Sequence, residues 1–145
     1  MATYSALDLI RRASHIGEFG DATLPHGEVT PTANVVTGDL LRVLRIPAGF
    51  RMYALLLSWA SQGATAPCDW GYTPMDTNEG SLAAAPTAFT SALAMASANV
   101  ATWLAGFNEI KFEQDAFLLG TFGTVVTGAA GVVRATCFGV SEGVR

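Results

Sequence analysis

Charged residues are scarce in this chain. Only 14% of its 145 residues are Asp, Glu, Lys or Arg, while 50% are hydrophobic; a typical domain carries about 25% charged residues. The shortage indicates that part of the apparent surface is covered when the protein works, by oligomerisation or by a large docking interface. The net charge is −4, and Lys111 is the single lysine. Because phosphate binding needs clustered Lys and Arg, we expect no direct nucleic-acid partner.

Long apolar runs and a leader sequence are also missing. The start, MATYSALDLIRRAS, lacks the basic and then apolar order of a signal peptide, and no apolar run approaches the length of a membrane span. We therefore expect synthesis in a cytoplasm and no membrane partner. In that compartment Cys68 and Cys137 are thiols by default, and we interpret them as small buried hydrophobes. A disulfide formed after release from the cell stays the alternative.

No catalytic or metal-binding motif stands out. His15 and His26 have no cysteine at metal-ligand spacing, and no serine lies in a G-x-S-x-G elbow. The glycines of GTFGTVVTGAAG, residues 120–131, do not follow dinucleotide-binding spacing and are typical of hairpin turns. We therefore predict no enzymatic activity, no cofactor and no metal.

Acidic residues gather at two places, and neither predicts a site. DTNEG, residues 76–80, lacks the closing acid of a calcium loop. Glu109, Glu113 and Asp115 surround Lys111, and we interpret them as ordinary strand or loop charge.

The chain divides into a polar N-terminal segment and an apolar body. Residues 1–36 are interrupted by glycines and prolines and have little to bury. A disordered tail is one interpretation; because surface charge is missing elsewhere, we favour an extended arm that orders on a neighbour. The body, residues 37–145, is expected to be one domain.

The residue pattern of the body predicts β-strands. Short β-forming segments are separated by Gly-rich turns, without the alternation of strand and helix that marks parallel sheets. We expect an all-β sandwich, with one short helix near Ser91–Ser97 in an alanine-rich loop. The strands are expected over residues 40–46, 51–59, 68–73, 117–122 and 132–140.

The strand over residues 51–59 is apolar on both faces. Strict alternation places Tyr53, Leu55, Leu57 and Trp59 on one face and Met52, Ala54, Leu56 and Ser58 on the other. One face belongs in the core, so the other requires a second cover.

The run GDLLRVLRIPAGFRMYALLLSWASQGATAPCDWGYTP resembles the head decoration, or capsid cement, proteins of tailed bacteriophages. In that group Gly-Asp opens the first strand, here Gly38-Asp39, and a strand leads into Ile-Pro-Ala-Gly, here Ile46–Gly49. An aromatic-Gly pair follows, here Trp70-Gly71, and the chain closes on a Gly-rich hairpin and a final strand, here residues 124–140.

The resemblance covers roughly residues 37–140 as an order of elements and implies a jelly-roll-like β-sandwich. It implies a virion protein on the outer capsid surface, assembled in the host cytoplasm, with the major capsid protein as partner and a homotrimer as the favoured oligomer. The second apolar strand face becomes an interface, and the arm lies on the shell or on a neighbouring subunit. The candidate interface residues are Leu7, Leu9, Ile10, Phe19, Val29, Met52, Ala54, Leu56, Trp70 and Tyr72.

Two other functions remain open from the residues. One is a different virion β-domain, in a tail tip, baseplate or fibre base, which copy number per particle would separate from a decoration protein. The other is a carbohydrate-binding jelly roll, in which Trp70, Tyr72 and Trp103 stack on sugar rings.

Overall fold

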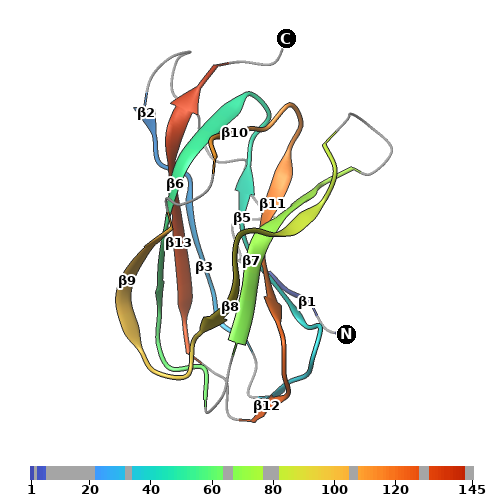
Figure 1. The fold of residues 1–145 in the computed structure, drawn as a ribbon, viewed down its shortest axis with the longest axis vertical. Coiled ribbons are helices and arrows are strands. Elements are labelled where there is room, and N and C mark those ends of the chain that lie inside the picture. Colours follow the sequence, from blue (N-terminus) through green and yellow to red (C-terminus); the bar gives the residue numbers. More distant parts are fainter. Residues whose placement is uncertain are drawn as a thin grey trace.

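The computed structural model describes residues 1, 3–5, 22–31, 34–63, 67–76, 82–104, 108–127 and 131–142, and the regular elements among them are all β-strands (Figure 1). In chain order these are β1 (Thr3–Ser5), β2 (Ala22–Thr23), β3 (His26–Val29), β4 (Asn34–Val35), β5 (Leu40–Ile46), β6 (Phe50–Trp59), β7 (Pro67–Pro74), β8 (Ala85–Ala94), β9 (Asn99–Leu104), β10 (Ile110–Lys111), β11 (Ala116–Phe122), β12 (Val126–Thr127) and β13 (Val133–Ser141).

The predicted all-β class is confirmed. The expected strands over residues 40–46, 51–59, 68–73, 117–122 and 132–140 correspond to β5, β6, β7, β11 and β13, with ends that differ by no more than one residue. Among the described residues, no helix is long and apolar enough to cross a membrane.

The strands form two main sheets. The first has the order β1-β5-β11-β7-β8, and the second has the order β10-β6-β13-β2, with β9 also on β6 and β3 also on β13. In Figure 1 the second sheet lies on the left and the first on the right. All these pairings are antiparallel except that of β1 with β5, which is parallel.

A single hydrophobic core is built from both sheets. Trp70, Leu118 and Ile46 come from the first sheet, and Leu55 and Leu57 come from the second; all five are fully buried. Each buried side chain of this size contributes about 1.5–3 kcal/mol relative to exposure. The core therefore holds the two sheets against each other.

The turns before and after β5 are formed by two short motifs, Gly38-Asp39 and Ile46–Gly49. Gly38 has a φ of 87°, and the buried carboxylate of Asp39 accepts a hydrogen bond from the Val36 N–H at 2.9 Å. After β5, the Ala48 N–H donates to Asp115 Oδ1 at 2.8 Å, and the Gly49 N–H donates to the Phe112 carbonyl at 2.6 Å. The first turn therefore fixes where β5 begins, and the second turn fixes how the chain passes from β5 in the first sheet to β6 in the second.

The predicted helix near Ser91–Ser97 is wrong. Ala85–Ala94 forms β8, an edge strand of the first sheet that pairs with β7. The register shifts between Trp70 and Tyr72 because Pro86 to Phe89 face a single β7 residue, and this bulge carries Phe89 into the core. Burial of Phe89 and Met95 outweighs the weak helix preference of the alanines. After β8 the chain crosses from the first sheet to β9, which pairs with β6 in the second sheet.

Parts of the N-terminal segment belong to the sheets. The pairs Val133↔Val29 and Thr136↔His26 join β3 to β13, and Val29 is only 4% exposed. A Cβ on Gly27 would collide with the carbonyl oxygen of Val43, so β3 also lies directly against β5. β4 pairs with β12, whereas the resemblance had implied a hairpin from residue 124 into β13. The division at residue 36 stays a prediction, but β3 pairs with the body on its own chain.

A bulge in β6 corrects the predicted face of two residues. The register with β13 shifts so that Phe138 pairs with Ala54 and Gly139 pairs with Met52, which leaves Tyr53 without a partner residue. Met52 therefore enters the core, fully buried, while Tyr53 is 44% exposed. Simple alternation fails here because a bulge adds one residue to the strand and exchanges its faces. As expected, Leu55 and Leu57 lie on the face of the strand opposite to Ala54 and Leu56.

Gly139 permits this bulge, and we predict that Gly139→Ala lowers the free energy of unfolding by about 1–3 kcal/mol. A Cβ at Gly139 would collide with the carbonyl oxygen of Arg51 and lie 2.6 Å from Phe50 Cζ. Urea denaturation measures the change. Gly123→Ala is the control, since its Cβ would meet Pro67 Cγ at 3.4 Å and should alter stability by no more than about 0.5 kcal/mol. Equal stability of both variants would contradict the steric argument.

Candidate functional site

An uncharged band runs along the outer side of the second sheet. It consists of Tyr53, Ala54 and Leu56 from β6 and Thr136 and Phe138 from β13, and we refer to it as the outer band. Phe138 pairs with Ala54 and Thr136 pairs with Leu56, so these side chains lie side by side. Their neighbours along both strands point into the core. Tyr53 is exposed and the other four are half-buried.

Ion pairs border the outer band at both ends. At one end Arg134 Nε donates to Glu28 Oε2 at 3.0 Å. At the other end Arg51 donates to both oxygens of Glu142, at 2.6 and 2.9 Å, and to Glu109 at 2.6 Å. These hydrogen bonds, that to Glu142 foremost, raise the pKa of Arg51 above its ordinary value. Exposed pairs stabilise a fold little, so their main effect is to place charge around an uncharged centre.

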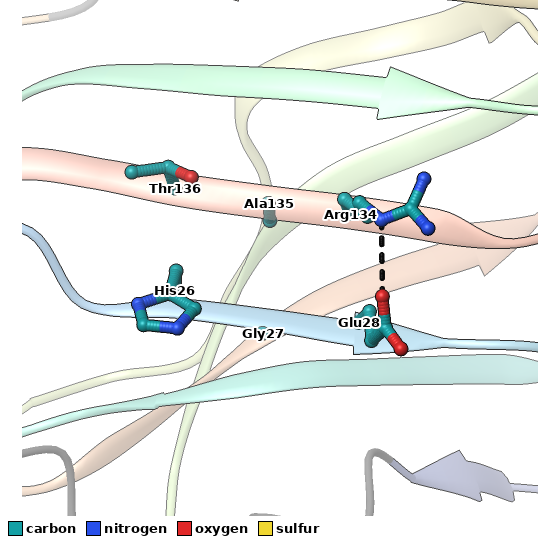
Figure 2. A pocket seen from close by; sticks show the side chains of 6 residues that line it. All are labelled: His26, Gly27, Glu28, Arg134, Ala135 and Thr136. Carbon is teal, nitrogen blue, oxygen red and sulfur yellow. Dashed lines mark hydrogen bonds and ion pairs between the residues drawn. The ribbon is translucent and has the colours of Figure 1, made fainter.

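A shallow groove of about 400 Å³ lies at the Arg134 end of the outer band (Figure 2). Its lining residues come from β3 and β13 and are His26, Gly27, Glu28, Arg134, Ala135 and Thr136. Figure 2 shows Glu28 and Arg134 reaching toward each other across the two strands, with His26 and Thr136 further along. Among the described residues, no three His, Cys, Asp or Glu side chains are grouped to hold a metal. The groove is suited to polar contacts at the rim of an interface.

The clustered carboxylates are paired one by one. Asp115 bonds to Arg45 and to the Ala48 N–H, Glu109 bonds to Arg51, and Glu113 lies 3.4 Å from Lys111. Each of these three carboxylates therefore has a different cation as partner, and Arg51 and Lys111 also contact Glu142. This arrangement fits their interpretation as structural charge.

The structure separates the described members of the predicted interface into three groups. Ala54 and Leu56 lie in the outer band. Met52, Trp70 and Val29 are core residues, with Met52 and Trp70 fully buried. Tyr72 is half-buried, and its ring centroid lies 5.1 Å from that of Phe112. The arm candidates Leu7, Leu9, Ile10 and Phe19 lie outside the described residues.

Burial of Trp70 also removes the main support for sugar stacking, because its indole has no exposed face. The side chain of Trp103 lies outside the described part of the chain.

Sequence reasoning missed Tyr53, Thr136 and Phe138 as members of the outer band. The alternation of β13 does place Thr136 and Phe138 on one face, but only the pairing of β13 with β6 places that face beside Leu56.

Both cysteines are buried free thiols, Cys68 in β7 and Cys137 in β13. Burial raises the pKa of both thiols, and the charge of Asp69 adds to the effect at Cys68. Because the thiolate is the reactive form, neither residue is suited to nucleophilic chemistry. Their interpretation as small buried hydrophobes is confirmed.

No protein-family model and no curated protein matches the chain. Solved structures do match it, and all three are phage capsids. A chain of the capsid of Ralstonia phage GP4 superposes with a TM-score of 0.73 at 17% identity, covering 99% of this chain and 100% of that one. A chain of the cyanophage Pam1 capsid gives a TM-score of 0.65 at 20% identity, covering 89% and 91%. A chain of the acidic stable capsid of Helicobacter pylori bacteriophage KHP30 gives a TM-score of 0.55 at 11% identity, covering 85% of this chain and 90% of that one. At these identities the likeness shows a shared fold.

Burial of the thiols gives a direct labelling prediction. At about pH 8 a thiol reagent such as DTNB should leave Cys68 and Cys137 of the native protein unmodified, because both are buried and their raised pKa values suppress the thiolate. Both should react once guanidinium chloride unfolds the chain. Fast labelling of the native protein would mean that the sandwich opens at one of these strands.

Proposed function

We propose that this chain is a structural virion protein that decorates and cements a bacteriophage capsid. The observation that carries the proposal is the end-to-end superposition on a chain of the Ralstonia phage GP4 capsid, which leaves almost no residue of either chain unmatched. A fold shared over the whole chain supports a shared role better than a match to one embedded domain. The low charge content also fits a protein that works with part of its surface covered.

The outer band is the surface that docks. It is uncharged along its centre and bordered by Arg134–Glu28 at one end and Arg51–Glu142 at the other. Protein interfaces have this anatomy, since charge is depleted at their centre and the rim is polar. The polar groove beside His26 extends the same surface. The partner is the major capsid protein, whose subunits the chain bridges on the outer side of the shell.

Several finer features belong to the same proposal. The sandwich is jelly-roll-like, the working oligomer is a trimer, and the N-terminal segment contributes contacts to a neighbour. Assembly takes place in the host cytoplasm, without nucleic acid, membrane or cofactor. The role is mechanical: each bridge between shell subunits adds contacts that must break before the shell ruptures, and many copies act together.

Reconstitution on capsids tests the role. Heads that lack this chain should rupture at lower temperature and under milder osmotic shock than complete heads, and the purified chain should restore their resistance. It should sediment with heads in copy numbers near those of the shell subunit. A few copies per particle would instead assign it to a tail or vertex. Heads that survive equally well without it would argue against cementing.

The docking surface is tested by Leu56→Asp, which places a charge at the centre of the outer band. Because Leu56 lies outside the core, the fold should persist, while affinity for heads should fall at least about tenfold, or about 1.4 kcal/mol. Val125→Asp is the matched control, since Val125 is 61% exposed and lies away from the outer band. Quantitative co-sedimentation and thermal melting measure both effects. Loss of binding in Val125→Asp alone would move the docking surface to the β11–β12 loop.

A further inference from the structure

The edge of the first sheet at β5 is covered by a very short strand. Thr3, Tyr4 and Ser5 of β1 pair in parallel with Leu40, Leu41 and Arg42. The other half of the β5 edge lies against β3, where Gly27 meets the Val43 carbonyl. Three residue pairs thus hold β1 in place, and they lie at a sheet edge (Figure 1).

The described strands between β1 and β5 do not belong to the first sheet. The chain passes through β2 and β3, which pair with β13 of the second sheet, and through β4, which pairs with β12. A parallel pair always needs such a long connection. Here the connection is anchored elsewhere, so β1 can leave the β5 edge without disturbing the pairings that follow it.

β3 is attached far more firmly than β1. It forms four register pairs with β13 and places Val29 in the core, and the Pro25 carbonyl accepts a hydrogen bond from the Cys137 N–H at 2.8 Å. Removing β3 would expose Val29 and leave one edge of β13 unpaired over Val133–Thr136. A segment that can leave the body therefore ends before Pro25, well short of residue 36.

We propose that, in the assembled particle, β1 of one copy occupies the β5 edge of a neighbouring copy. The occupant is β1 of a second copy, because the same edge already accepts this strand within one chain. The exchanged strand makes identical pairs, so the exchange loses no contacts. Residues 6–21 can span at most about 55 Å between β1 and β2, and copies held close on a shell have high effective concentrations.

The exchange rests on the proposed function, because the shell supplies the neighbours. It is tested by the double variant Thr3→Cys/Leu40→Cys, which joins register partners of β1 and β5. Paired strands place Cα atoms within the range that a disulfide spans. The native Cys68 and Cys137 are buried and should not interfere. The oxidised protein is analysed on non-reducing gels, once free and once on heads.

A matched control uses Asn34→Cys/Thr127→Cys, register partners of β4 and β12, which are both exposed and lie outside the proposed docking surface. On heads, Thr3→Cys/Leu40→Cys should migrate mostly as covalent oligomers, while the control should stay a monomer, since β4 follows Pro25 and does not leave the body. The single variants Thr3→Cys and Leu40→Cys should give no ladder of oligomers.

The outcomes separate the two proposals. Monomers of the β1–β5 variant on heads that carry the chain overturn the exchange and leave the decoration role intact. Interchain bridges in the β4–β12 control would contradict the claim that the exchanged segment ends before Pro25. If the wild-type chain does not sediment with heads at all, the decoration role fails and the exchange fails with it. A ladder that ends at the third band would support exchange within a closed trimer.

Discussion

The close approach of Gly139 to the Arg51 backbone is the constraint on which much of this structure depends. It lets β13 lie against β6 where a side chain would collide, and it leaves Tyr53 as an extra residue in β6. Before the bulge Phe50 and Met52 point into the core, and after the bulge Leu55, Leu57 and Trp59 point into it. The same register brings Ala54 and Leu56 beside Phe138 and Thr136, so one backbone contact shapes both the core and the outer band.

The charged residues mainly form ion pairs near the ends of strands, where they fix turns and strand ends in place. Asp115 connects Arg45 with the turn after β5, and Arg51 connects β6 with Glu109 and with Glu142 after β13. With so few charged residues, pairing them at the periphery leaves the middle of the second sheet uncharged. A surface of this kind is favourable to cover and unfavourable to leave in water, so the docking role that we propose agrees with the composition.

The two proposals assign different tasks to the two sheets. The second sheet presents the outer band to the shell, while the first sheet has an edge at β5 that accepts β1 of a neighbour. A face that binds the shell and a strand that connects copies reinforce each other, since each bound copy raises the local concentration of the next. β3 lies against β5 and pairs with β13, and in the exchange that we propose it remains fixed while β1 moves.

The sequence by itself determined the all-β class, five of the long strands and the burial of both cysteines, because these follow from local alternation, turn residues and composition. It also indicated that β6 is apolar on both faces. Tertiary structure decided that Ala85–Ala94 is a strand, since pairing with β7 and burial of Phe89 and Met95 in the core outweigh the helix preference of alanine. It likewise decided the placement of Met52, Val29 and Phe138. Those positions depend on pairings between strands far apart in the chain, and a local pattern carries no information about which distant backbone will lie beside it.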